Sequence, residues 1–197
     1  RPDRRPAAVH PLKAGGDEIM ENILNGRARR FGDDINTDYI IAGKYTKTLD
    51  FSSLAEHLLE DLFPGFSKTI LPGDMIVAGR NFGCGSSREQ APIAIRCAGI
   101  AAVLAKSYSR IFFRNAINQG IPAFLCDTDS IAEGDRIIVN IGSTTVELPD
   151  RGTTLPMTPL SPVMLDILKE GGLVEYLKRH GGFVLDPQAS DRPRREG

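Results

Sequence analysis

Residues 81–89 contain the side chains with the clearest chemical potential in this chain. Their sequence, Asn-Phe-Gly-Cys-Gly-Ser-Ser-Arg-Glu, lies between an apolar run at 75–79 and a segment of helical periodicity. The two glycines allow a tight turn in which the backbone approaches a ligand closely. The first amides of a helix lack internal acceptors, so such a strand–turn–helix corner is suited to binding anions. Because Arg88 adds a planar guanidinium that pairs well with a carboxylate, the first predicted ligand is a small carboxylate.

The same corner has a purely structural alternative. Ser86 and Glu89 have the spacing of a capping box, in which two side chains satisfy each other's free amides at the start of a helix. Pro92 bears on this choice because it has no N–H to donate within a helix. A helix must therefore begin near Pro92 or bend there, and residues 83–91 are expected to be less regular than a simple cap requires. This expectation favours a functional role for the corner, and the capping box is kept as the alternative interpretation.

Composition and charge argue against several classes of protein. The formal net charge of −1 gives no argument for binding nucleic acid or an acidic membrane surface. No apolar run approaches the ~20 residues that span a bilayer, and no signal peptide is recognisable. The cysteines, Cys84, Cys97 and Cys126, are odd in number and widely spaced. A disulfide framework is therefore not expected, which favours a reducing cytoplasm, and the spacing does not resemble an iron–sulfur ligand set.

The histidines offer no obvious catalytic partner. His57 and His180 lie in charged, helix-like segments and are interpreted as solvated surface residues. The run around Ser86 is also not the G-x-S-x-G turn of a hydrolase nucleophile. A serine hydrolase is therefore disfavoured.

Strands and helices that alternate along the chain must position the motif. Strands are predicted at 26–31, 75–79, 100–105, 121–126, 136–141 and 144–148, the last two as a hairpin. Helices are predicted after Asp50 as an N-cap, from the motif to a C-cap at Gly99, and over 107–119, 161–169 and 174–180. This order predicts an α/β fold with a mixed, largely parallel central sheet flanked by helices. Ligands of such sheets bind beyond the carboxyl ends of strands, where residues 79–87 would lie.

The composition of the two ends differs from that of the middle. Residues 1–19 are basic and rich in Pro and Gly, and they are predicted to be a disordered extension or a non-native leader. Residues 20–185 form the predicted folded domain. Residues 186–197 are predicted to be a disordered polar tail.

Four stretches of the chain resemble the swivel domain of the aconitase superfamily. They follow the order seen in that family and are residues 31–38, 79–89, 105–112 and 115–122. More closely, the chain is similar to the separate small subunits of 3-isopropylmalate dehydratase and homoaconitase over roughly residues 22–183. The Gly-Ser-Ser-Arg-Glu run at 85–89 is the most specific piece of this resemblance.

The resemblance implies a swivelling β/β/α fold and a hydro-lyase activity. Family members isomerise a small hydroxy di- or tricarboxylic acid by removing water and adding it back at the neighbouring carbon. The resemblance also implies that this chain binds no cofactor, and that a 4Fe–4S cluster lies on a separate large subunit. By motif match, Ser86 is the general base, Ser87 hydrogen-bonds the substrate or the alkoxide, and Arg88 binds a carboxylate.

Two further substrate-binding positions, Asp38 and Lys47, are carried over from the resemblance. Asp38 matches the family's active-site aspartate in a Thr-Asp pair, and an Asx-type turn at 33–38 is the structural alternative. Lys47 occupies the family's specificity loop, in a Tyr-Thr-Lys run where members often have Tyr-Leu-Arg or Tyr-Leu-Val. A solvated surface lysine is the alternative there. Three positions receive no assigned role: Gln90, where members commonly have histidine, Arg110 and Arg114.

These inferences predict the small subunit of a heteromeric 3-isopropylmalate dehydratase, which converts 2-isopropylmalate to 3-isopropylmalate in leucine biosynthesis. Within the same class, the alternatives are a homoaconitase or a dehydratase for another alkylmalate, such as citramalate or dimethylmalate. From a different class, the same helix-terminus site would serve a non-catalytic, carboxylate-binding regulatory module.

Overall fold

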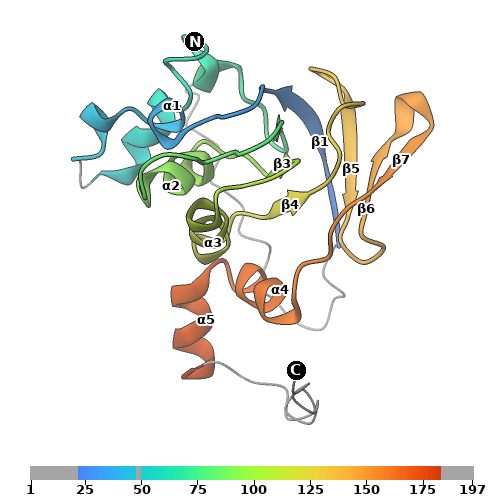
Figure 1. The fold of residues 1–197 in the computed structure, drawn as a ribbon. Coiled ribbons are helices and arrows are strands. Elements are labelled where there is room, and N and C mark those ends of the chain that lie inside the picture. Colours follow the sequence, from blue (N-terminus) through green and yellow to red (C-terminus); the bar gives the residue numbers. More distant parts are fainter. Residues whose placement is uncertain (1–21, 48–49, 183–197) are drawn as a thin grey trace, which may run out of the picture.

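A single curved β-sheet forms the frame of the molecule (Figure 1). The structure is a computed structural model, and it describes residues 22–47 and 50–182. Within these residues, seven strands pair in the order β4-β3-β2-β1-β5-β6-β7. Their bounds are β1 Ile23–Arg30, β2 Met75–Ala78, β3 Ala102–Ala105, β4 Ala123–Leu125, β5 Arg136–Asn140, β6 Thr145–Leu148 and β7 Thr153–Pro156.

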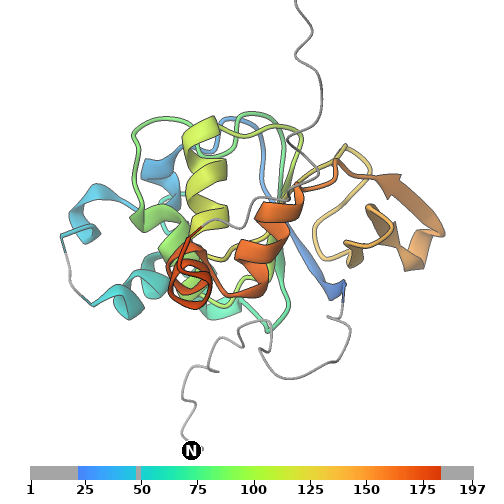
Figure 2. The same cartoon turned by 90° about the horizontal axis from the view of Figure 1, so that it is seen from below.

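Strand β1 joins a parallel half of the sheet to an antiparallel arm. Its residues 28–30 pair in parallel with β2, and β2, β3 and β4 continue in parallel. Its residues 23–27 pair antiparallel with β5, and β6 and β7 continue the arm. Figure 2 shows the arm set to one side of the parallel half, away from the helices. The predicted fold class, α/β with a mixed and largely parallel sheet flanked by helices, is confirmed.

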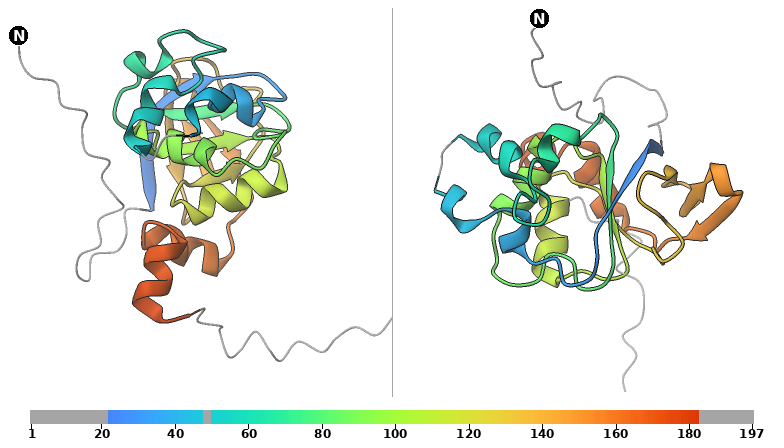
Figure 3. Two further views of the ribbon diagram at one scale, coloured as in Figure 1. Left: turned by 90° about the vertical axis from the view of Figure 1, so that its left-hand side faces the viewer. Right: turned by 90° about the horizontal axis from the view of Figure 1, so that it is seen from above.

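Helices cover one face of the parallel half (Figure 3). The α-helices are α1 Thr37–Ile40, α2 Gln90–Cys97, α3 Arg110–Asn118, α4 Pro162–Lys169 and α5 Leu173–His180. Short 3₁₀ helices are η1 Gly43–Tyr45, η2 Phe51–His57, η3 Phe66–Thr69 and η4 Pro149–Arg151. Buried side chains of α2, α3, α4 and α5 pack in one cluster with β2 and β3.

The side chains of β2 show why its sequence is continuously apolar. Ile76 and Ala78 belong to the cluster on the helix side, whereas Met75 and Val77 belong to a second cluster shared with the arm. Alternate residues of a strand face opposite sides, and both sides of this strand are covered. All of its residues are accordingly buried. The same pattern holds for β3, as the apolar run at 100–105 predicts.

Two local predictions were wrong. The segment after Asp50 is a 3₁₀ helix rather than an α-helix, although Asp50 caps it as expected by accepting from the Ser52 N–H at 3.1 Å. Leu59 has a φ of +54°, which an α-helix does not tolerate, so the helical pattern ends before it. Strand β7 was not predicted, because its half-exposed residues carry no apolar run and it forms only by pairing with β6.

The described residues contain no helix that is both long and apolar enough to cross a membrane. The predicted extension at 1–19 and the predicted tail at 186–197 lie outside the described part of the chain. The folded domain predicted at 20–185 contains every strand and helix that the structure describes.

Candidate functional site

The glycine turn between β2 and α2 packs tightly against α3. Gly83 has a φ of +74°, and a Cβ atom built there would lie 2.1 Å from Cγ of Phe112 in α3. Gly85 has a φ of +89° beside Thr37. These conformations favour glycine, because an L side chain at positive φ is strained. Without side chains at these glycines, the backbone of the turn packs directly against α3 and α1. Ser86 and Ser87, which follow, are exposed at the surface.

The structural alternative of a capping box is wrong. Glu89 is the N-cap of α2 in a right-handed helical conformation, and its cap makes no side-chain hydrogen bond. Ser86 instead forms a bend in which its carbonyl accepts from the Arg88 N–H at 2.9 Å. Helix α2 begins at Gln90, so Pro92 lies in its first turn, as the sequence predicts. Residues 83–89 precede the helix and are irregular, so their backbone groups do not pair in the pattern of a helix.

Unpaired amides gather around Ser86. The backbone N–H groups of Ser86, Ser87 and Glu89 donate to no acceptor within residues 22–47 and 50–182. Both serines are exposed. Neighbouring N–H groups without acceptors form a concave donor set that stabilises a negative charge. The corner therefore has the donors that an anion needs, at the surface where an anion can reach them.

The buried Thr37 holds Ser86 in place by hydrogen bonding. Its side chain is buried, and its Oγ1 donates to the Ser86 carbonyl at 2.9 Å and lies 3.4 Å from the Ser86 Oγ. Its N–H donates to the Cys84 carbonyl at 2.9 Å. Asn36 caps α1 by accepting from the Tyr39 N–H at 2.9 Å, which fixes Thr37 at the first position of the helix. Sequence reasoning did not single out Thr37, although its place before Asp38 was a usable signal.

Arg88 and Asp38, both assigned to substrate binding by the resemblance, lie together in the structure. The Arg88 Nη1 forms an ion pair with Asp38 Oδ1 and donates to the Ile41 carbonyl at 3.3 Å. The Asp38 side chain is 55% exposed and that of Arg88 is 24% exposed. The Arg88 guanidinium also lies against Gly43, where a Cβ would be 3.5 Å from Nη2. A partly exposed guanidinium fixed in this way keeps further N–H donors, and Arg88 lines the same hollow as Ser86.

Lys47 is not brought into contact with these residues. Its side chain is exposed and has no hydrogen bond or ion pair within the described part of the chain. The loop that carries it nevertheless begins at Gly43 beside Arg88. Of the positions without an assigned role, Gln90 is half-buried at the start of α2, and Arg110 and Arg114 are exposed on α3.

A small hollow joins these residues but is too tight to hold a ligand alone. It offers no space for even a water-sized sphere. Its lining comes from α1, the glycine turn and α3: Thr37, Gly83, Gly85, Ser86, Ser87, Arg88, Ser109, Ile111, Phe112 and Asn115. The buried Asn115 is a second polar residue that sequence reasoning missed. The described residues therefore enclose no substrate pocket at this corner by themselves.

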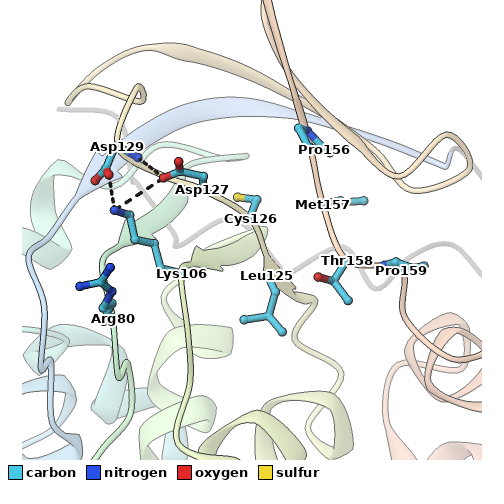
Figure 4. Close-up of a pocket in the computed structure, with 10 residues that line it drawn as sticks. All are labelled: Arg80, Lys106, Leu125, Cys126, Asp127, Asp129, Pro156, Met157, Thr158 and Pro159. Carbon is cyan, nitrogen blue, oxygen red and sulfur yellow. Dashed lines mark hydrogen bonds and ion pairs between the residues drawn. The ribbon is translucent and has the colours of Figure 1, made fainter.

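A larger hollow of about 810 Å³ lies at the ends of β3 and β4 near the residues after β7 (Figure 4). Lys106 lies within it, paired with Asp129 and 3.6 Å from Asp127. The hydrogen bond to Asp129 raises the pKa of Lys106 above its ordinary value. Arg80 lines the same hollow. None of the site residues predicted from the sequence borders it.

The described residues provide no ligand set for a metal or an iron–sulfur cluster. No group of three histidine, cysteine or acidic side chains gathers in residues 22–47 and 50–182. Cys126 is buried, which raises its pKa to about 12, and burial also raises the pKa of Cys84 above its ordinary value. A cluster ligand must be a thiolate, so neither thiol is prepared for that role.

The interpretation of His180 as an exposed surface residue is confirmed, whereas His57 is partly buried. Both rings also have packing partners. The His57 ring stacks on Tyr45 with centroids 3.6 Å apart, and its Nδ1 lies 2.5 Å from Glu60. The His180 ring lies against Tyr176, and its Nε2 lies 3.3 Å from Glu170. The local charge pattern predicted the surface position of His180, but only the tertiary structure shows the ring contact that each histidine makes.

Comparison with known proteins identifies relatives along most of the chain. A family model described as the aconitase C-terminal domain matches residues 18–124. The 3-isopropylmalate dehydratase small subunit 2 of Archaeoglobus fulgidus is 52% identical over 161 residues, which cover 81% of this chain and 98% of that protein. The methanogen homoaconitase small subunit of Methanothermobacter thermautotrophicus is 47% identical over 160 residues, which cover 81% of this chain and 94% of that protein.

The fold is likewise that of a solved relative. The crystal structure of a 3-isopropylmalate dehydratase from Methanocaldococcus jannaschii superposes with a TM-score of 0.78 at 45% identity, covering 81% of this chain and 95% of that one. These matches confirm the resemblance that the motifs indicated. Because the family model matches more than half of the sequence and the relatives align over most of it, the chain belongs to the aconitase C-terminal domain family.

Proposed function

We propose that this chain is the small subunit of a heteromeric hydro-lyase that isomerises 2-isopropylmalate to 3-isopropylmalate by dehydration and rehydration. The names of the relatives support this activity. The observation that carries it is the exposed hydroxyl of Ser86 among unpaired amides, with a guanidinium beside it. The reaction of a small hydroxy di- or tricarboxylic acid needs both a group that accepts its proton and hydrogen-bond donors that bind its carboxylates.

Ser86 is the proposed base that removes the proton from the substrate carbon. A serine hydroxyl does not ionise unaided at neutral pH, and each unit of pKa depression requires about 1.4 kcal/mol of preferential stabilisation of the anion. The free N–H groups of Ser86, Ser87 and Glu89 supply part of this stabilisation. Thr37 fixes the Ser86 backbone, so the hydroxyl keeps its position as it loses its proton.

Arg88 is the proposed carboxylate ligand, with Ser87 as a hydrogen-bonding neighbour. Asp38 and the Ile41 carbonyl hold one edge of the guanidinium, which orients the remaining N–H groups. A planar guanidinium binds a carboxylate through two parallel hydrogen bonds. The substrate would thus be held by a carboxylate while Ser86 acts on the adjacent carbon.

A separate large subunit is proposed to complete the site. The described residues enclose no substrate pocket at the corner by themselves, and they hold no ligand set for a cluster. The 4Fe–4S cluster belongs to the partner in this proposal, and it supplies Lewis acidity toward the leaving hydroxyl. The relatives are themselves named small subunits, which supports a partner of this kind.

A homoaconitase small subunit is the second candidate. A relative with this name is 47% identical to the chain, and Lys47 lies in the loop beside Arg88. A lysine there suits a substrate with a distal carboxylate, whereas an alkyl group prefers an apolar side chain. Citramalate and dimethylmalate are further substrates of the same class, and they lack that distal carboxylate.

The test is to purify the chain with a large subunit from the same organism and to assay isopropylmalate, homocitrate and citramalate. Ser86→Ala should lower kcat by about 10²-fold or more, because it removes the base while the subunits still co-purify. Ser143→Ala, at an exposed serine between β5 and β6, is the control and should keep the activity. A Ser86→Ala complex that turns over normally contradicts the role of Ser86. A wild-type complex that binds these acids without converting them supports the non-catalytic regulatory module instead.

A further inference from the structure

The loop at residues 42–47 follows α1 and lies next to the proposed substrate site. It begins with η1, whose Gly43 lies against the Arg88 guanidinium, and it carries Lys47 at an exposed position. The Thr46 hydroxyl donates to the Gly43 carbonyl at 2.8 Å and closes the turn after η1. The path of this loop therefore determines where Lys47 lies relative to Arg88.

An aromatic contact between Tyr45 and His57 holds this loop against the domain. The Tyr45 and His57 rings lie 3.6 Å apart at an interplanar angle of 4°, so they are stacked face to face. The Tyr45 hydroxyl donates to Glu60 Oε1 at 3.1 Å, and the other Glu60 oxygen lies 2.5 Å from His57 Nδ1. The same carboxylate thus joins both stacked rings. The hydrogen bond with His57 is the main cause that lowers the pKa of Glu60 below its ordinary value. These three residues are called the Tyr45–His57–Glu60 cluster below.

The partners of Tyr45 are held by the core. His57 ends η2, and the next residue, Leu58, is fully buried together with Leu54. The Leu59 N–H donates to the Ile40 carbonyl at 3.0 Å, which ties this segment to α1. His57 and Glu60 therefore belong to the rigid body of the domain. The loop residue Tyr45 contacts both of them. The position of the loop is therefore fixed relative to the core.

We propose that the Tyr45–His57–Glu60 cluster positions the specificity loop, and that His57 thereby sets the affinity for the part of the substrate that reaches Lys47. This inference rests on the proposed function, because it assigns a positioning residue to the same site. His57 itself touches no residue of the proposed catalytic set, and it acts through Tyr45. In this proposal His57 acts on the loop through its stacked ring, and the Tyr45–Glu60 hydrogen bond is a separate contact.

The kinetic test uses the complex with the large subunit. His57→Ala should raise the KM for the preferred substrate about tenfold while kcat changes by less than about threefold, because Ser86 and Arg88 keep their contacts. His57→Phe retains a flat ring against Tyr45 and should restore the wild-type KM. His180→Ala is the matched control, since this histidine has a similar exposure and lies on α5. It should leave both constants unchanged.

A second measurement needs no activity. Trypsin cleaves after Lys44 and Lys47 when the loop leaves its position, so the full-length His57→Ala chain should be cut there several-fold faster than wild type, and His57→Phe and His180→Ala should not. Equal cleavage rates, or a His57→Ala enzyme with an unchanged KM, would overturn the proposal. If the wild-type complex converts none of the acids, the proposed function fails, and the cleavage rates still decide whether the cluster holds the loop.

Discussion

Arg88 connects three segments that are distant in sequence. It pairs with Asp38 in α1, donates to the Ile41 carbonyl after that helix, and lies against Gly43 at the start of the next loop. Its own position follows Ser86 in the glycine turn. A change in any of these segments moves the guanidinium relative to the serine hydroxyl. At the scale of single residues, the site is therefore a set of backbone and side-chain contacts around one arginine.

Lys47 provides a test at this scale. Lys47→Val removes a cation from the loop beside Arg88, so a substrate with a distal carboxylate should lose affinity relative to one with an alkyl group. We expect the ratio of kcat/KM for homocitrate to that for isopropylmalate to fall by about tenfold. The measurement is competition between the two acids on the reconstituted enzyme. Unchanged competition would remove Lys47 from the determinants of specificity.

At the scale of elements, the turn between β2 and α2 is shaped by α3. Phe112 of α3 is buried and fills the space where a side chain on Gly83 would lie. Phe112 also packs edge to face against Phe82, with ring centroids 5.1 Å apart. The turn cannot move away from α3 without exposing these rings. Two elements that are separated in sequence thereby define one corner.

Gly83→Ala tests this packing. The new Cβ meets Phe112 at a positive φ, so the substitution combines backbone strain with overpacking and should lower the free energy of unfolding by roughly 2–4 kcal/mol. Gly99→Ala is the matched control, because Gly99 has a similar φ of +81° and no atom within 4 Å of its built Cβ. It should cost about 1 kcal/mol. Urea denaturation of the purified chain measures the free energy of unfolding of both variants. If both lose the same amount, Phe112 moves aside without cost and the packing argument is wrong.

At the scale of the whole molecule, a buried carboxylate ties the two halves of the sheet. Asp74, just before β2, is 2% exposed and accepts from Arg27 and Arg29 of β1 at 3.0–3.2 Å. Arg29 also pairs with Glu133, just before β5, at 3.0 Å. The segments that lead into the parallel half and into the arm are thus joined through β1.

Asp74→Ala should destabilise the fold. It leaves the buried Arg29 guanidinium without one of its partners, and removing one partner of a buried pair costs about 3 kcal/mol or more. Asp150→Ala is the control, because Asp150 pairs with Arg136 at 3.4 Å with both side chains largely exposed. That change should stay within about 0.5 kcal/mol. Thermal unfolding compares the two variants, and a similar melting temperature for both would contradict the structural role of Asp74.

Local chemistry was sufficient for the fold class, and it singled out the residues of the proposed site, whose roles stay a prediction. The apolar runs at 75–79 and 100–105 predicted strands covered on both faces, and Pro92 predicted a late start for α2. The spacing around Ser86 predicted an anion corner with Arg88. These features are encoded by neighbouring residues, because strand burial, proline geometry and glycine turns act within a few positions of the chain.

Other features depend on contacts between distant residues, and only the tertiary structure decided them. Thr37 meets the Ser86 carbonyl across 49 positions of sequence, and His57, predicted to be a solvated surface residue, is partly buried and stacks on Tyr45. Strand β7 exists because β6 offers it a free edge. Such contacts arise when separate segments are brought together by burial of the apolar core, and no local pattern records which polar groups will then meet.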